Sequence, residues 1–303
     1  MAMTRSTLNL GRDIYMDVIT DAGEGADRSY EYCLNVFSTT QDHEDFKLID
    51  AFGYASPTNE GAAYLTEDRS ELYTAAFYWQ KYTHGYGWTE EAKYTDQFNK
   101  LEESGRLVVE AIEDTRAKSC SDMFNNGFNT TSYAGIDTVS LFHTTHPTNG
   151  GTTWSNRPST DVALSASTFG QAIQEMMQVK DSKNRPVRST PKGVVLRVPP
   201  ALYMTAKTIE ATTRGRPGTT DNDAAVQREF LNSIFMDQQL TSTTAWFLTD
   251  ADKSRLGLKL MTGLPRETTM DPQPGYGKAF FYTRDSWVAF WTHARHTWGT
   301  TGA

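Results

Sequence analysis

DQFNKLEESGRLVVEAIEDTRAKSCSDMFNNG, residues 96–127, is the stretch that decides how this chain folds. Its apolar side chains recur at steps of three and four, the spacing that places them on one face of an α-helix. This stripe consists of Phe98, Leu101, Gly105, Val108, Val109, Ile112, Cys120, Met123 and Phe124. Asp96 can cap the start, and Asn125-Asn126-Gly127 is a stop signal. The pattern predicts one helix about 45 Å long, apolar on one side, that serves as a spine for a sheet.

Composition limits the classes of function. The 303 residues are 38% hydrophobic, enough to bury a core of one large or two ordinary domains, and the net charge is -8. An acidic chain is poorly suited to neutralising phosphates, and its only compact basic cluster, Arg214-Gly215-Arg216, is typical of a solvated loop. The two cysteines, Cys33 and Cys120, are too few for a disulfide framework and are expected to pack in the core.

Targeting signals are not evident. The first residues carry Arg5 and Arg12 without an apolar segment, and no run of eighteen apolar residues occurs. We therefore expect a cytoplasmic protein with reduced thiols.

Upstream of the spine, residues 1–28 resemble an arm that adheres to another surface, and residues 30–37 are expected to form a strand. Two β-prone runs, 62–66 and 72–82, flank the charged tip Glu67-Asp68-Arg69-Ser70 and predict a long hairpin. Aromatic side chains fall on both of its faces, namely Phe77, Tyr78, Trp79 and Tyr82. A ribbon of two strands is marginal in water, so a sheet or another subunit must cover it. Gly85-Tyr86-Gly87 is interpreted as a hinge, followed by a short helix from Thr89.

Downstream of the spine, a polar loop leads to an amphipathic helix at 165–180, capped by Ser165 or Ser167. A buried strand at 193–198 and a helix at 200–211 resemble an α/β unit. Residues 224–234 are predicted as a helix, 245–248 and 256–260 as strands, and 271–277 as a turn. Residues 279–282 and 287–291 are predicted as a strand pair around Arg284-Asp285-Ser286, and 293–303 as a polar tail.

The strongest hint of chemistry is His143-Thr144-Thr145-His146. Two imidazoles three residues apart can bind zinc on a helix, but Pro147 and the following glycines exclude a helix here. We expect these histidines to hydrogen-bond to the backbone of a loop. The sequence has no phosphate-binding loop, HExxH or GxSxG motif, and its acidic pairs fit a solvated helix face. No catalytic residue, metal site or cofactor is therefore expected.

The order of these parts resembles the Hong Kong 97 fold of tailed-phage major capsid proteins, and more closely the Mu-type major head subunits. Five stretches carry the resemblance: 85–91 running into the spine, NNGF at 125–128, LFHTTHPTNGG at 141–151, VVLRVPPAL at 194–202 and AWFLTD at 245–250. It implies an α+β fold with a spine helix, peripheral and axial domains, an extended β-hairpin loop and an N-terminal arm.

The resemblance also implies domain boundaries. The arm would be 1–29 and the extended loop 55–88. The peripheral domain would be 30–54, 89–183 and 278–303, and the axial domain 184–277. The loop would contact a neighbouring subunit through Glu67, Asp68, Arg69, Phe77, Tyr78, Trp79 and Tyr82. The spine would present Phe98, Leu101, Val108, Ile112 and Met123 to the peripheral domain.

The function implied is structural. Many copies would form pentamers and hexamers and close into an icosahedral head around double-stranded DNA, with portal, scaffold and decoration proteins as partners. The chain would be made in the host cytoplasm and end in the virion capsid. Two alternatives remain open: an encapsulin-like compartment, and a metal-dependent hydrolase that uses His143 and His146.

Overall fold

The computed structural model describes residues 28–49, 51–64, 66–68, 71–95, 100–130, 135–148, 152–187, 193–211, 230–273 and 277–302. The expected arm up to residue 27, the cap Asp96 and the basic cluster at 214–216 lie outside these residues. So do Arg69 and Phe98, and Leu101 is described in its backbone alone.

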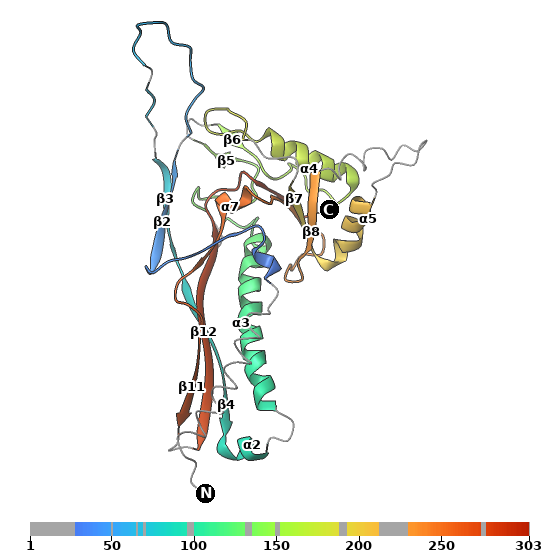
Figure 1. Cartoon of the computed structure of the whole chain (residues 1–303). Helices are drawn as coiled ribbons and strands as arrows, with labels where there is room; N and C mark the ends of the chain where they lie inside the picture. The colour runs from blue at the N-terminus through green and yellow to red at the C-terminus, as the bar shows by residue number, and fades with distance from the viewer. Residues whose placement is uncertain are drawn as a thin grey trace.

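The spine helix is confirmed as α3, Lys100–Asn125, and a short helix, α2 (Glu90–Thr95), precedes it as predicted. Val108, Ile112 and Met123 are all buried, at 5%, 3% and 1% exposure. Figure 1 shows α3 running beside strands β4 and β12, which its apolar face covers. The stripe in the sequence is therefore the contact between the helix and a sheet.

That sheet has the strand order β1-β10-β12-β11, with β4 on the other side of β12. Its strands are β1 (Asn35–Ser38), β4 (Gln80–Thr89), β10 (Leu258–Thr262), β11 (Glu267–Gln273) and β12 (Lys278–Trp291). The predicted strand pair at 279–291 is wrong, because β12 runs through Arg284-Asp285-Ser286 without a turn. Asp285 points inward, where Arg266 lies 3.1 Å and Arg116 3.7 Å from its carboxylate. These two cations compensate a charge that would otherwise favour a turn at the surface.

The expected hinge at Gly85-Tyr86-Gly87 is also wrong, since these residues lie inside β4. Gly85 pairs with Tyr282 and Gly87 with Phe280 on β12. A methyl group on Gly87 would come within 2.7 Å of the Phe280 ring, and one on Gly85 within 2.9 Å of Tyr282. The glycines make room for two aromatic rings that lie across the strand, which keeps this segment extended.

The predicted hairpin has a different partner strand. β3 (Glu71–Tyr78) pairs with β2 (His43–Ile49), and the described residues between 51 and 68 form no strand. In β2 the apolar Phe46 and Leu48 alternate with charged residues, and Phe46 packs on Phe290 with ring centroids 5.2 Å apart. β2 is the partner strand because its apolar face packs on the larger sheet, and this packing stabilises a strand more than the weak β-propensity of 62–66 does.

A second sheet has the order β13-β9-β7-β8. Its strands are β7 (Val194–Val198), β8 (Leu231–Met236), β9 (Trp246–Asp250) and β13 (Thr297–Thr300). Two predictions are wrong here. The end of the helix expected at 224–234 is strand β8, paired in parallel with β7. The expected tail contains β13, whose four residues are all buried. Burial against partners far away in the sequence decides both elements.

Helix α4 (Ala166–Gln178) confirms the amphipathic helix. Ser165 caps it through a reciprocal pair of hydrogen bonds with Thr168. Its buried Phe169 and Met176 share a core with β7 and with Trp298 of β13. A turn of 3-10 helix (Pro200–Leu202) and α5 (Tyr203–Ala211) complete this end of the molecule, as predicted for 200–211.

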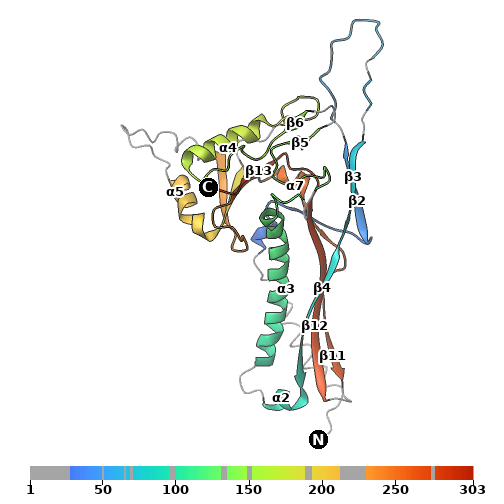
Figure 2. The same ribbon diagram turned by 180° about the vertical axis from the view of Figure 1, so that it is seen from behind.

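Figures 1 and 2 show an elongated molecule. α3, β4, β11 and β12 form a long limb, and the second sheet with α4 and α5 forms a compact end. From the junction, the β2–β3 ribbon and residues 51–68 project away from both. Within the described part of the chain, no helix combines the length and apolar character needed to cross a membrane.

Candidate assembly surfaces

The projecting segment, residues 51–68, is the first candidate surface. Phe52, Tyr54 and Tyr64 are 47%, 73% and 91% exposed. At its base, Glu67 accepts a hydrogen bond of 2.7 Å from the Gly53 amide and pairs with Lys183 at 2.8 Å. The predicted contact residue Glu67 therefore anchors the base of the segment within its own chain.

The aromatic side chains that follow this segment pack against their own chain more than expected. The Phe77 ring stacks on Phe290 at 4.0 Å and the Tyr82 ring on Trp287 at 3.9 Å. The two rings belong to different sheets. The strand is interrupted at Trp79, so Phe77 lies on β3, paired with β2, and Tyr82 lies on β4, paired with β12. Of the two covers left open for the ribbon, a sheet or another subunit, both rings have the first, because Phe290 and Trp287 lie on β12 of the same chain. Of the four aromatic residues predicted to contact a neighbour, Phe77, Tyr78, Trp79 and Tyr82, the most exposed is Tyr78, at 58%.

Trp79 is also held by its own chain. Its Nε1 donates to the Gln41 carbonyl at 2.7 Å. The indole lies against the backbone of Gly263, where a methyl group would come within 2.4 Å of the ring. These contacts indicate that Trp79 stabilises the subunit itself, which was not predicted from the sequence.

We expect Trp79→Ala to lower the free energy of unfolding of the subunit by about 2–3 kcal/mol, because it empties a half-buried site and loses a hydrogen bond. The adjacent Tyr78→Ala is the matched control, with an expected loss below about 1 kcal/mol. Urea unfolding of the unassembled subunits measures both. A Trp79→Ala subunit as stable as wild type, yet defective in assembly, would restore the original prediction of an inter-subunit contact.

A buried ion pair links the compact end to the spine. Arg197 on β7 and Asp237, just after β8, are 2.9 Å apart and 2% and 3% exposed. Ser121 on α3 donates to the same carboxylate at 2.7 Å. The Arg197 guanidinium lies between two rings, 4.1 Å from the centre of Phe124 and 4.7 Å from that of Phe235. The second sheet, the loop after β8 and the spine helix therefore meet at one buried ion pair whose charges are compensated.

A second network ties the start of the described chain to the limb. The carboxylate of Glu113 on α3 accepts from the Tyr30 hydroxyl at 3.0 Å and lies 3.0 Å from Arg28 and 2.6 Å from Arg266. Burial opposes the charged form, but the two guanidinium groups outweigh it and hold the pKa of Glu113 below its usual value. Burial beside Glu113 raises the pKa of Tyr30, which therefore stays a donor.

The histidine loop is a structural element. His146 is fully buried, with its Nδ1 2.8 Å from Asp137 and its Nε2 3.0 Å from Asn156. The expected backbone bonds are wrong for this ring, whose partners are side chains. His143 Nδ1 instead accepts from the Thr145 amide at 3.1 Å. Over the part of the chain that the structure describes, no group of three metal-ligating residues occurs, so the hydrolase hypothesis finds no support there.

Both cysteines are buried as expected, at 2% and 0% exposure. Burial raises the pKa of Cys120 to about 12 and also raises that of Cys33. Thiols this weakly acidic and this enclosed are poor nucleophiles.

Two further histidines lie between β12 and β13. Burial, together with nearby positive charge, lowers the pKa of His293 to about 3, and burial lowers that of His296 to about 4. The unfolded chain takes up protons near pH 6.5, whereas the folded chain stays neutral at both rings until the pH is far lower. The contribution of these two neutral rings to the free energy of unfolding is therefore fully present above about pH 6.5 and is lost as the pH falls toward 4.

We expect the unfolding free energy of the subunit to fall between pH 7 and 5, by about 2 kcal/mol for each ring. His296→Gln should make this pH dependence shallower by about that amount. Urea unfolding at several pH values measures the slope, above the range in which Glu113 titrates. Parallel pH profiles for wild type and variant would contradict the assignment.

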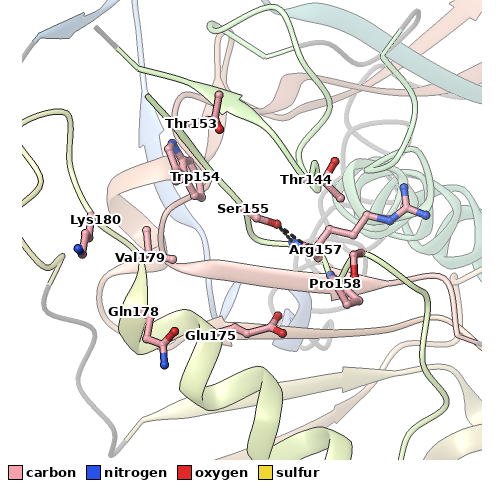
Figure 3. Close-up of a pocket in the computed structure, with 11 residues that line it drawn as sticks. Thr144, Thr153, Trp154, Ser155, Arg157, Pro158, Glu175, Gln178, Val179 and Lys180 are labelled. Carbon is pink, nitrogen blue, oxygen red and sulfur yellow. Dashed lines mark hydrogen bonds between the residues drawn. The ribbon is translucent and has the colours of Figure 1, made fainter. Parts of the chain in front are cut away.

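The second candidate surface is a cavity of about 450 Å³ between α4 and a small hairpin, β5 (His146–Pro147) and β6 (Thr153–Trp154). In Figure 3, Glu175 and Gln178 lie on α4 along one side of the cavity, and Trp154 lies on β6 on the other side. Trp154 is held by stacking on His146 at 4.2 Å, and Glu175 by the Trp298 indole N–H at 2.7 Å. This cavity could not be predicted from the sequence, because its lining comes from three separate segments: Thr144, 153–159 and 175–180.

The overall arrangement, a spine helix beside a long sheet with a compact α/β end, is that of virus capsid subunits. The capsid of the cyanophage P-SCSP1u matches with a TM-score of 0.61 and 8% identity, over 90% of this chain and 88% of that one. A structure from Microbacterium phage Oxtober96 matches with a TM-score of 0.56 and 8% identity, over 92% of each chain. A virus-like particle from Pyrococcus furiosus matches at 0.51 and 9%, over 94% and 97%. Identities this low establish the fold alone, and no curated protein matched in sequence.

Residues 73–301 match the sequence model of the phage capsid protein family. Since this is most of the chain, the chain belongs to that family. It is thus a structural component of a virion that acts in a shell of many copies, not an enzyme. The expected α+β capsid fold and structural role are confirmed.

Proposed function

We propose that this chain is a Mu-type major head subunit whose copies close into an icosahedral phage head around double-stranded DNA. The observation that carries the proposal is the projecting segment, residues 51–68, which leaves its own molecule and exposes Tyr54 and Tyr64. A projecting segment that exposes several large apolar side chains is typical of a surface that another molecule covers. The Mu-type branch is supported by the order of the five stretches at 85–91, 125–128, 141–151, 194–202 and 245–250.

The domain division follows the packing. We assign α3 with β4, β10, β11 and β12 to the peripheral domain, and β7, β8, β9 and β13 with α4 and α5 to the axial domain. Relative to the expected boundaries, α4 and β13 move to the axial domain because both pack against β7 and β9. β10 and β11 move to the peripheral domain, and most of β4 moves there from the extended loop, because all three pair with β12. The axial domains would meet in pentamers and hexamers. Residues 51–68, with Asp68 at their end, would lie on a neighbouring subunit.

The remaining partners follow from the same proposal. A portal, a scaffold and decoration proteins would join the shell, and the subunits would be made in the host cytoplasm. The net charge of -8 fits a wall that confines DNA without sequence-specific contact.

Negative-stain microscopy of the chain, expressed alone and with its neighbouring genes, tests the proposal. We expect closed shells of uniform diameter that carry DNA when the packaging genes are present. Shells that hold a protein cargo and no DNA would favour an encapsulin-like compartment. Small discrete particles under every condition would contradict shell formation.

A further inference from the structure

We infer that the cavity between α4 and the β5–β6 hairpin is a binding site for a neutral saccharide unit, with Trp154 as the surface on which the sugar ring packs. The inference goes beyond the proposed function, because the formation of a shell requires no ligand at this place. It starts from the side chains that line the cavity and from the contacts that they make or lack.

One side of the cavity is a fixed aromatic surface. Trp154 borders the cavity, and the buried His146 stacks on its indole with ring centroids 4.2 Å apart and 12° between the planes. The His146 ring is in turn held by Asp137 and Asn156. The indole therefore keeps its orientation without a ligand. The C–H face of a pyranose ring packs on an indole of this kind, because both surfaces are flat and apolar.

Most of the remaining lining is polar and unpaired. Of the two carboxylate oxygens of Glu175, Oε2 accepts from the Trp298 indole at 2.7 Å, and Oε1 has no described partner. Hydroxyl and amide groups both donate and accept, so the lining offers each kind of partner that sugar hydroxyls need. Five further lining side chains make no hydrogen bond or ion pair with another described residue: Thr144, Thr153, Ser159, Gln178 and Lys180.

The charges at the cavity favour a neutral ligand. Arg157 is already paired with Asp161 at 2.8 Å, and its guanidinium lies 4.7 Å from the centre of the Phe128 ring. The charged groups that remain are one cation and one anion, Lys180 and Glu175. A phosphate or another strong anion would therefore meet no excess of positive charge.

Size and polarity favour a sugar over an apolar side chain. The volume of about 450 Å³ lies within the range of roughly 300–1,000 Å³ for small-molecule sites. Only Trp154, Pro158 and Val179 of the lining residues are apolar. An apolar group that filled the cavity would take the polar lining out of water without replacing its hydrogen bonds. A pyranose ring brings its own hydroxyls, which face the Glu175 and Gln178 side of Figure 3 when the ring packs on the indole.

Saturation-transfer NMR of the full chain, as unassembled subunits, tests the site. The sugars are methyl β-D-glucoside, methyl β-D-galactoside and N-acetylglucosamine, and adenosine and N-acetyltyrosinamide represent other classes of ligand. We expect transfer to the ring protons of at least one sugar, with a dissociation constant in the millimolar range because few atoms make contact. Transfer to no sugar, or equal or stronger transfer to adenosine or N-acetyltyrosinamide, would overturn the inference.

Three variants test whether the sugar binds in this cavity. Gln178→Ala, at an exposed position on α4, should weaken binding about fivefold, because it removes an amide that hydrogen-bonds to the ligand. Trp154→Ala should weaken binding at least about tenfold. The matched control is Gln174→Ala, the same substitution one turn earlier on α4 and outside the lining, which should bind like wild type. Equal binding by wild type and all three variants would place the sugar elsewhere and overturn the inference.

Folding is separated from binding in the same set of variants. Gln174 and Gln178 are exposed, so both alanine variants should unfold in urea like wild type. Trp154→Phe keeps an aromatic ring against His146 and should recover most of the affinity that Trp154→Ala loses. Shells are observed by microscopy and sugar binding by NMR, so a chain that forms shells but binds no sugar would overturn this inference and leave the proposed function intact.

Discussion

Arg197→Ala should destabilise the unassembled subunit by about 3–5 kcal/mol, one of the two largest effects we expect. The substitution leaves Asp237 buried at 3% exposure without its cation and removes the group that Phe124 and Phe235 enclose. A carboxylate that loses its buried partner retains the full cost of desolvation. Urea unfolding, followed by tryptophan fluorescence, measures the loss.

The matched experiment for this prediction removes both charges. Arg197→Met/Asp237→Asn should recover much of the lost stability, because an apolar side chain of similar length fills the space and no charge stays unpaired. The control is Lys118→Ala, which removes an exposed i,i+4 ion pair with Asp122 and should cost less than about 0.5 kcal/mol. If Arg197→Ala behaves like this control, the pair at Arg197 does not join the compact end to the spine energetically.

Trp298→Ala should cost about 3–5 kcal/mol, although the residue lies in a segment that the sequence suggested to be a tail. Trp298 is 1% exposed, packs against Trp246 with ring centroids 4.7 Å apart, and donates to Glu175 at 2.7 Å. Its loss opens a large cavity in the core under α4. Thermal unfolding of the subunit is the measurement, with a large drop in the transition temperature expected.

Two controls separate packing from hydrogen bonding at this site. Trp298→Phe keeps an aromatic ring but loses the N–H, and should cost about 1–2 kcal/mol. Met204→Ala, on α5 at 74% exposure, should be nearly neutral. A Trp298→Ala subunit with unchanged stability would mean that the closing strand β13 contributes little to the fold.

Much of the helical structure could be predicted from local patterns. The apolar stripe of α3 and the Ser165 cap of α4 are properties of a few adjacent residues, so the sequence reveals them. The strands were harder, because their burial depends on distant partners. The polar run at Arg284-Asp285-Ser286 suggests a turn until Arg116 and Arg266 are known to lie beside it.

The candidate surfaces also contain features that local sequence reveals and features that depend on distant partners. That this region reaches a neighbour was expected from the resemblance, but the run 62–66 was predicted as a strand, and the described residues between 51 and 68 form none. Which aromatic rings stay exposed did not follow, because Phe77 and Tyr82 are covered by Phe290 and Trp287 from the far end of the chain. The cavity could not be predicted at all, since it requires the placement of α4 relative to a two-residue strand at Trp154.

The pairing of early strands with late ones also sets the order in which a new chain can fold. Asn35 of β1 pairs with Lys259 of β10, and Trp88 of β4 pairs with Ala279 of β12. At a synthesis rate of about 5–20 residues per second, the early strands wait roughly ten to forty seconds for these partners. Long-range pairing of this kind also makes folding slow. The projecting segment joins the sheet through β2 and β3, which pack on Phe290 of β12. It therefore reaches its final orientation only after nearly the whole chain has been made.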